Sequence, residues 1–234
     1  MPVFELGSSY VFPAPDLAEP DGLLAIGGGL EPDRLLVAYA AGIFPWYSEG
    51  QPILWHSPDP RMVLRPRELK ISKSMMRTLR HVTLEIRCDT AFREVIHECA
   101  AIPRPYQTGT WITPEMIDAY ADLYERGLAH SVEAWLDDRM VGGLYGVALG
   151  GCFFGESMFS IERDASKVAF VQLVQQLVDW NFDLIDCQVY TDHLASMGAV
   201  EMARGKFLRL LRTSLQRETR RGPWSFSRPC AAVS

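Results

Sequence analysis

The chain has 234 residues, of which 48% are hydrophobic and 22% are charged, and its formal net charge is −6. This composition is typical of a soluble globular protein, and no apolar run approaches the ~18 residues that cross a membrane. Five cysteines without a CxxC spacing argue against a disulfide framework and a zinc site, and the N-terminus has no signal-peptide pattern, so we expect a cytoplasmic protein.

Positive charge is concentrated in two segments. Residues 61–81 contain seven Lys or Arg and one Glu, and residues 201–221 contain seven Lys or Arg and two Glu, which gives +6 and +5. The rest of the chain therefore carries −17. Basic segments on an acidic protein suit a polyanion such as RNA, although solvated helix faces produce the same pattern.

Residues 1–62 are rich in Pro, Gly and aromatic residues, which predicts turns and short strands around one helix. That helix is expected from Pro32 to about Ala41, with Glu31–Pro32 at its start and Gly42 after its end. The triple glycine at 27–29 lacks the GK[ST] of a phosphate-binding loop and predicts only a turn.

From residue 71 onward, apolar spacings of three and four predict helices, and alternating patterns predict strands. The expected helices cover 71–80, 90–100, 114–126, a stretch from 166, and 207–218. The expected strands cover 82–87, 130–136, 140–149, 151–154 and 184–189. Asp137–Asp138 and Gly150–Gly151 are predicted hairpin turns, residues 102–109 a loop, and the tail from Gly222 a loose segment.

Residues 151–189 predict a strand, a turn at 155–157, a helix and a second strand, which is a βαβ-like unit. Since residues two apart on a strand share a face, Asp186 and Gln188 are expected to project together and Cys187 to point away. This arrangement suits a catalytic pair as well as a structural one, and it argues against a cysteine nucleophile.

The order of the elements predicts an α+β protein of the acyltransferase (GNAT-like) type. We expect a mainly antiparallel sheet with flanking helices, and the length allows one large domain or two smaller ones. The turn before the central helix, ERDASK, lacks the glycines that hold the coenzyme A pyrophosphate in such enzymes, so coenzyme A is not the expected acyl donor.

Ten motifs, in order along residues 21–199, closely resemble those of the bacterial leucyl/phenylalanyl-tRNA–protein transferases. They are DGLLAIGG (21–28), AYAAGIFPWYS (38–48), ILWHSPDPRMVL (53–64), TWIT (110–113), AHSVEAW (129–135), VGGLYGV (141–147), FFGESMFS (153–160), ASK (165–167), LIDCQ (184–188) and HxxSMGA (193–199).

The resemblance implies an aminoacyltransferase that moves Leu, Phe and sometimes Met from aminoacyl-tRNA to the N-terminal Arg or Lys of acceptor proteins. The product is a signal for N-end-rule degradation. The family has a small N-terminal domain, expected here as an α+β domain over residues 1–62, and a GNAT-like catalytic domain, expected over residues 63–234. It needs no cofactor and no metal. We expect a cytoplasmic monomer whose partners are Leu-tRNA, Phe-tRNA and such acceptor proteins.

The resemblance also implies roles for particular residues. The catalytic centre is expected at Asp186, Gln188 and Glu156, with His193 as polar support. Other expected groups are Trp46 and Trp111 for the 3′-adenosine of tRNA, and Leu144, Phe153, Met158 and Ile185 for the amino-acid side chain. The concentration of positive charge, and not the resemblance, adds the residues expected to hold the tRNA backbone from one helix, which are Lys70, Lys73, Arg77 and Arg80.

Several alternatives stay open. Asp186 is either a general base oriented by Gln188 or a structural residue, with a vicinal ribose hydroxyl moving the proton instead. Glu156 is expected to hold either the cationic side chain of the acceptor or the donor's α-amine. Other classes are a coenzyme-A-dependent N-acyltransferase and a non-catalytic RNA-binding module. Departures from the family pattern at Gly29, His56 and Leu144 are also present, and the last bears on the preference between Leu and Phe.

Overall fold

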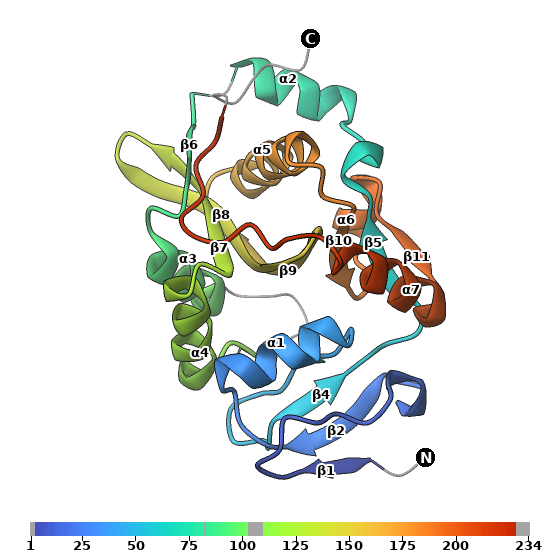
Figure 1. Cartoon of the computed structure of the whole chain (residues 1–234). Coiled ribbons are helices and arrows are strands. Elements are labelled where there is room, and N and C mark those ends of the chain that lie inside the picture. The colour runs from blue at the N-terminus through green and yellow to red at the C-terminus, as the bar shows by residue number, and fades with distance from the viewer. Residues whose placement is uncertain (1–2, 82, 103–109, 228–234) are drawn as a thin grey trace.

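The computed structural model describes residues 3–81, 83–102 and 110–227. Across these residues the strands form a four-stranded sheet near the N-terminus and a seven-stranded sheet, and helices pack around the larger one (Figure 1). The predicted loop at 102–109 lies outside the described residues except for Ile102. Val82 and residues 228–234 of the tail lie outside them as well.

The smaller sheet has the strand order β1-β2-β4-β3. Its unit consists of β1 (Phe4–Leu6), the 3-10 helix η1 (Pro15–Leu17), β2 (Leu23–Gly27), α1 (Pro32–Ala40), β3 (Phe44–Pro45) and β4 (Leu54–His56). Helix α1 begins at the predicted proline, whose missing N–H costs nothing in a first turn, and it ends before Gly42, which has a φ of +75°. The prediction for this helix is confirmed within one residue.

The larger sheet has the order β11-β5-β10-β9-β8-β7-β6. Its strands are β5 (Arg61–Leu64), β6 (Glu85–Cys88), β7 (Ala129–Leu136), β8 (Arg139–Leu149), β9 (Cys152–Ser160), β10 (Leu184–Gln188) and β11 (Val200–Met202). Among the described strand pairs of this sheet, only β9 and β10 run parallel. The predicted α+β class with a mainly antiparallel sheet is confirmed.

The remaining helices cover both faces of this sheet. They are η2 (Pro66–Glu68), α2 (Lys73–His81), α3 (Phe92–Ala101), α4 (Pro114–Glu125), α5 (Ala165–Asp179), α6 (Asp192–Ser196) and α7 (Arg204–Ser214). Two adjacent glycines on β8 show that α5 and α3 lie on opposite faces of the sheet. A Cβ at Gly142 would meet Ala165 of α5, and one at Gly143 would approach Val95 of α3. Among the described helices, none combines the length and apolarity needed to cross a lipid bilayer.

The predicted βαβ unit is confirmed as β9, α5 and β10, with Phe153 paired to Ile185 in the parallel ladder. The predicted turn at 155–157 is wrong, because β9 continues to Ser160 and pairs with β8 along its length. The pairing shifts register between Tyr145 and Gly146, which pair with Ser157 and Gly155, so Glu156 is the extra residue of a bulge in β9.

The two sheets share one apolar core. Leu35 and Trp55 of the N-terminal unit belong to the same buried cluster as Tyr120 of α4 and Phe154 of β9. A second cluster lies between the sheet and α5. Strand β5 begins at Arg61, so the last residues of the expected N-terminal domain already lie in the larger sheet.

The end of the described chain is packed, so the predicted loose tail is wrong for residues 222–227. Trp224 is 3% exposed, and its ring stacks on His130 at a centroid distance of 3.6 Å and an interplanar angle of 9°. Its backbone N–H donates to Asp89 Oδ2 at 2.6 Å. The predicted helix at 207–218 is displaced toward the N-terminus, because α7 begins at Arg204 and ends at Ser214. After Ser214 the chain bonds the turn at Gly150–Gly151, through the Ser214 carbonyl and the Thr219 hydroxyl.

Candidate active site

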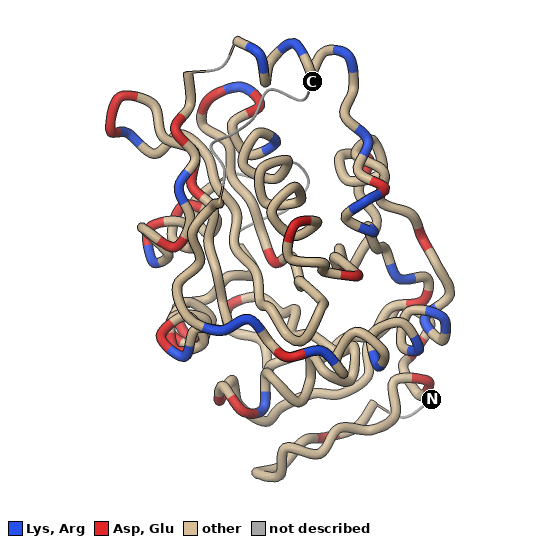
Figure 2. The backbone as a smooth tube through the Cα atoms, turned by 45° about the horizontal axis from the view of Figure 1, so that its top comes forward, with Lys and Arg blue, Asp and Glu red and all other residues tan. Residues whose placement is uncertain are grey.

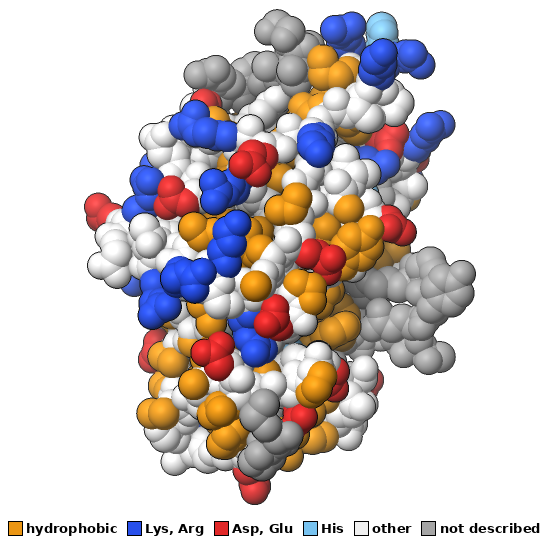
Figure 3. All heavy atoms as spheres, turned by 90° about the vertical axis from the view of Figure 1, so that its right-hand side faces the viewer, with side chains coloured by type: hydrophobic (Ala, Val, Ile, Leu, Met, Phe, Trp, Pro, Cys, Tyr) orange, Lys and Arg blue, Asp and Glu red, His pale blue; other side chains and the backbone are white. Residues whose placement is uncertain are grey.

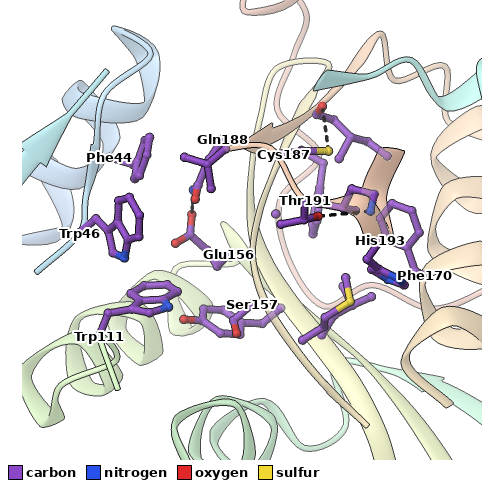
Figure 4. A pocket seen from close by; sticks show the side chains of 18 of the residues that line it. Phe44, Trp46, Trp111, Glu156, Ser157, Phe170, Cys187, Gln188, Thr191 and His193 are labelled. Carbon is purple, nitrogen blue, oxygen red and sulfur yellow. Dashed lines mark hydrogen bonds between the residues drawn. The ribbon is translucent and has the colours of Figure 1, made fainter. Parts of the chain in front are cut away.

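A cavity of about 320 Å³ lies where β8, β9 and β10 meet the aromatic residues that follow α1 (Figure 4). Nine of the predicted site residues line it. They are Trp46, Trp111, Leu144, Phe153, Glu156, Met158, Ile185, Gln188 and His193. Asp186 and the four basic residues are not among its lining residues.

Aromatic rings form the outer part of this cavity. Figure 4 places Phe44, Trp46 and Trp111 on one side of Glu156 and Gln188. Trp46 is 43% exposed, and it meets His56 edge-on at a centroid distance of 5.6 Å. An indole held this way by its edge leaves a flat face free for another ring.

Glu156 is held by hydroxyl and amide donors. The Tyr39 hydroxyl donates to Oε1 at 2.7 Å, the Tyr120 hydroxyl to Oε2 at 3.0 Å, and the Gln188 side-chain amide to Oε1 at 2.9 Å. The hydroxyls of Tyr39 and Tyr120 are also hydrogen-bonded to each other. These donors come from α1, α4 and β10, so three separate elements fix one carboxyl group.

Burial raises the pKa of Glu156 to about 7. Hydrogen bonds from Tyr39, Tyr120 and Gln188 favour the charged form and oppose this rise, whereas the negative charge of Asp186 adds to it. A carboxyl group whose pKa is about 7 gains and loses a proton readily near neutral pH, which is the property expected of a general acid or base.

Asp186 and Gln188 do not share a face, so that prediction is wrong. The pairing of β10 with β5 shifts register between these two residues, and Gln188 has a φ of +62°. This bulge turns the Gln188 side chain into the cavity, and its backbone N–H donates to Asp186 Oδ1 at 2.9 Å. Asp186 itself is 0% exposed.

Asp186 points to Arg61 instead. The guanidinium donates twice, from Nε to Oδ1 at 2.8 Å and from Nη2 to Oδ2 at 2.6 Å. Arg61 is 1% exposed and lies over the rings of Phe44 and Phe207, at 4.7 Å from each centroid. The geometry therefore favours the structural reading of Asp186, a residue that anchors the Gln188 bulge.

Cys187 lines the cavity and Asp186 does not. The two side chains therefore point to opposite faces as predicted, but it is Cys187, and not Asp186, that faces the site. Burial is the main cause that raises the pKa of its thiol well above the ordinary value, and the charge of Asp186 contributes. A neutral thiol is a poor nucleophile, so the argument against a cysteine mechanism now rests on its protonation state.

Apolar side chains form the inner part of the cavity. The predicted residues Leu144, Phe153 and Ile185 are each at most 3% exposed, and Met158 stands beside them on β9. Phe170 of α5 also lines this part and was not predicted. Its position on the helix gives no sequence signal that separates it from an ordinary core residue.

His193 lines the cavity from the short helix α6, whose N-terminus is capped by the Thr191 side chain. Burial lowers the pKa of His193, and the nearby charge of Lys167 lowers it further. Its buried Nε2 makes no hydrogen bond to a described residue. This neutral imidazole nitrogen is available to a ligand in the cavity.

The basic residues lie elsewhere. Lys73, Arg77 and Arg80 line a shallow groove on α2, where Figure 2 shows blue along the helix and Figure 3 shows a basic cluster at the top of the face. Lys70 precedes this helix, so the expectation that all four share it is wrong. Arg61 and Arg204 are buried, so each basic segment exposes one cation fewer than its sequence contains.

Sequence reasoning assigned no role to Tyr39, Tyr120 or Arg61. Tyr39 and Arg61 fall within recognised motifs, and all three are at most 1% exposed. A buried tyrosine needs a partner for its hydroxyl, but the sequence does not say which partner. Only the fold brings α1 and α4 together on Glu156.

Comparison with known proteins places this chain among transferases. Residues 63–212 match the family described as leucyl/phenylalanyl-tRNA protein transferase, and residues 28–59 match the N-terminal domain of the same transferase. A leucyl/phenylalanyl-tRNA–protein transferase of Myxococcus xanthus is 55% identical over 96% of this chain and 97% of its own length. One of Anaeromyxobacter sp. (strain Fw109-5) is 56% identical over 99% of this chain and 100% of its own length. The chain belongs to the leucyl/phenylalanyl-tRNA protein transferase family.

Solved structures show only distant likeness. L-PGS from Bacillus licheniformis aligns with a TM-score of 0.40 and 11% identity over 74% of this chain and 57% of its own. A GCN5-related N-acetyltransferase from Kribbella flavida aligns with a TM-score of 0.36 and 11% identity over 72% of this chain and 60% of its own. Likeness at this level carries no argument about function.

Proposed function

We propose that this protein transfers leucine or phenylalanine from aminoacyl-tRNA to the N-terminal Arg or Lys of acceptor proteins, and so marks them for degradation. Membership of the family supports the donor and the protein acceptor. The requirement for a basic N-terminal residue and the recognition of particular proteins are parts of the proposal.

One observation carries it, namely the continuity of the cavity from Trp46 past Glu156 and Gln188 to an apolar chamber. A terminal adenosine stacked on Trp46 or Trp111 would leave its ester at the polar centre. The leucine or phenylalanine side chain would then enter the space beside Leu144 and Phe153, which offers no charged partner.

The transfer reaction requires correct positioning of the ester and the amine more than it requires a strong catalytic group. An aminoacyl ester is already activated, and an N-terminal α-amine has a pKa of about 8, so part of it is neutral at cytoplasmic pH. The Gln188 amide, oriented by the bulge at Asp186, is placed to donate to a developing oxyanion. Glu156 is the carboxyl group placed to contact the amine of the acceptor as it approaches the ester.

The direct test incubates the purified protein with radiolabelled Leu-tRNA and three peptides that differ only in the first residue, Arg, Lys or Ala. We expect label on the Arg and Lys peptides and none on the Ala peptide. Label on all three peptides would contradict the requirement for an N-terminal Arg or Lys in the acceptor. If the protein binds the tRNA but labels none of the peptides, the proposed transferase activity is contradicted, and the result favours a non-catalytic RNA-binding module.

A further inference from the structure

Three hydroxyl and carboxyl groups form a closed ring at the polar centre. Tyr39 contacts Glu156, Tyr120 contacts Glu156, and the two hydroxyls contact each other. When Glu156 is charged, the ring has two hydroxyl hydrogens for three contacts, so one contact has no hydrogen. When Glu156 is neutral, three hydrogens serve three contacts.

Neither protonation state of this ring is strongly favoured over the other. The charged form gains two hydroxyl donors and the Gln188 amide, whereas the neutral form closes the ring and avoids a buried charge. These opposing effects hold the pKa of Glu156 near 7, between its ordinary range and that of a fully buried acid.

Groups on four elements face this ring. They are Tyr39 from α1, Tyr120 from α4, Tyr145 from β8, and Gln188 and Asp186 from β10, the last already paired with Arg61. Burial is the main cause that raises the pKa of both Tyr39 and Tyr120 well above 10.0, so these hydroxyls keep their hydrogens. Glu156 is therefore the member of the ring that gains and loses a proton.

Glu156 also lies where a substrate can reach it. It lines the cavity, whereas both oxygens of Asp186 are occupied by Arg61 and the Gln188 backbone, and Asp186 does not line the cavity. We propose that Tyr39, Tyr120 and Glu156 form a proton-holding ring in which Glu156 takes a proton from the attacking amine and the tyrosines position its carboxyl group. This inference rests on the proposed transfer reaction.

The step balances without a further reactant. A neutral acceptor amine bonds to the carbonyl carbon of the ester, and the bond from that carbon to the ribose oxygen breaks. The nitrogen loses one proton to an oxygen of Glu156, and Glu156 returns one proton to the departing ribose oxygen. Glu156 thus ends charged, as it began.

The test compares Tyr39→Phe, Tyr120→Phe and Glu156→Gln with the wild type, and uses Tyr124→Phe as a matched control. Tyr124 lies one turn from Tyr120 on α4, but its hydroxyl donates to the Asp89 carbonyl oxygen. Each ring variant loses a donor to charged Glu156, so the acid limb of kcat/KM should move up by about one pH unit. The control should follow the wild type, and Glu156→Gln should lose on the order of 100-fold in kcat.

A second readout does not depend on turnover. The infrared band of the protonated Glu156 carboxyl group, obtained as wild type minus Glu156→Gln, should titrate near neutral pH and at higher pH in both ring variants. Folded ring variants whose activity profile and infrared titration match the wild type would overturn the inference, as would full activity of Glu156→Gln. A wild type that transfers no amino acid would refute the proposed function, while the infrared titration would still decide the ring.

Discussion

Arg61 and Asp186 form a doubly hydrogen-bonded ion pair in which both side chains are at most 1% exposed. The pair joins β5 to β10, and the same Asp186 accepts the backbone N–H of Gln188. Two hydrogen bonds in series therefore link the Arg61 guanidinium to the Gln188 backbone, and they fix the bulge that turns the Gln188 side-chain amide into the cavity.

The first prediction concerns this pair. Arg61→Met leaves a buried carboxylate without its partner, which should reduce the free energy of unfolding by about 3–5 kcal/mol. The double variant Arg61→Met, Asp186→Leu should recover much of that stability and yet stay poorly active, because Gln188 has lost its anchor. Urea unfolding with parallel transfer assays measures both effects. Equal stability of the single and double variants would contradict the prediction.

A second prediction concerns pH and stability. The pKa of Glu156 is 4.5 for the ordinary group and about 7 in the folded protein, so between these values the unfolded chain releases a proton that the folded chain keeps. The free energy of unfolding therefore falls as pH rises from 4.5 to 7, by up to about 3 kcal/mol at roughly 1.4 kcal/mol per unit.

Glu156→Gln should lack this loss, so its stability relative to the wild type should increase between pH 5 and pH 8. Urea unfolding of both proteins at the two pH values measures the difference. A difference that stays constant with pH would show that Glu156 has an ordinary pKa.

The third prediction concerns the groove on α2. Lys73→Ala and Arg77→Ala should each lower the slope of log affinity against log salt by about 0.7–0.9 for tRNA, since each removes one phosphate contact. Arg139→Ala serves as the control, because Arg139 is exposed at a hairpin and paired with Glu162. If all three variants keep the wild-type slope, the tRNA backbone binds another surface.

The fourth prediction concerns the choice of amino acid. Leu144→Phe narrows the apolar chamber, so it should reduce kcat/KM for Phe-tRNA at least about tenfold more than for Leu-tRNA. Leu149→Phe, near the end of the same strand, leaves the chamber unchanged and is the matched control. Competition between the two aminoacyl-tRNAs measures the ratio, and an unchanged ratio would place the side chain of the donor elsewhere.

The fifth prediction concerns the packed end of the chain. Trp224→Ala removes an indole that stacks on His130, and it should cost about 3–5 kcal/mol of stability. Phe226→Ala, a half-buried residue of the same segment, should cost less. Thermal unfolding compares them, and equal losses would mean that Trp224 contributes no more than its neighbour.

Much of the architecture could be predicted from local patterns. End signals and helical spacing predicted α1, α3 and α4 within a residue or two. The turn residues Asp137–Asp138 and Gly150–Gly151 bounded β7 and β8 equally well, although both strands are buried on both faces. The turn expected at 155–157 failed because Gly155 and Ser157 pair with β8, the preceding strand of the same hairpin, and the Gly-Glu-Ser sequence does not show that this hairpin continues to Ser160. The tail failed because Trp224 is held by Asp89 and His130 rather than by its neighbours.

The site was predicted in composition but not in orientation. The family motifs named Glu156, Gln188 and the cavity residues, yet the two-residue period of a strand wrongly placed the Gln188 side chain on the same face as Asp186. The reason is the positive φ of Gln188, which follows from how β10 meets β5 and leaves no local signature. Tyr39 was missed for a similar reason, since its partner Glu156 lies 117 positions further along the chain.

The position of Tyr39 bears on how this chain can be divided and recombined. Because α1 supplies one of the hydroxyls on Glu156, a chimera that exchanges the N-terminal unit between relatives exchanges a proton-tuning group together with the aromatic rings around Trp46. With the roles proposed for Trp46 and Glu156, such a chimera would exchange recognition of the donor and proton transfer at the ester together. A substitution in the first forty residues can alter the pH response of an enzyme whose catalytic strands have not changed.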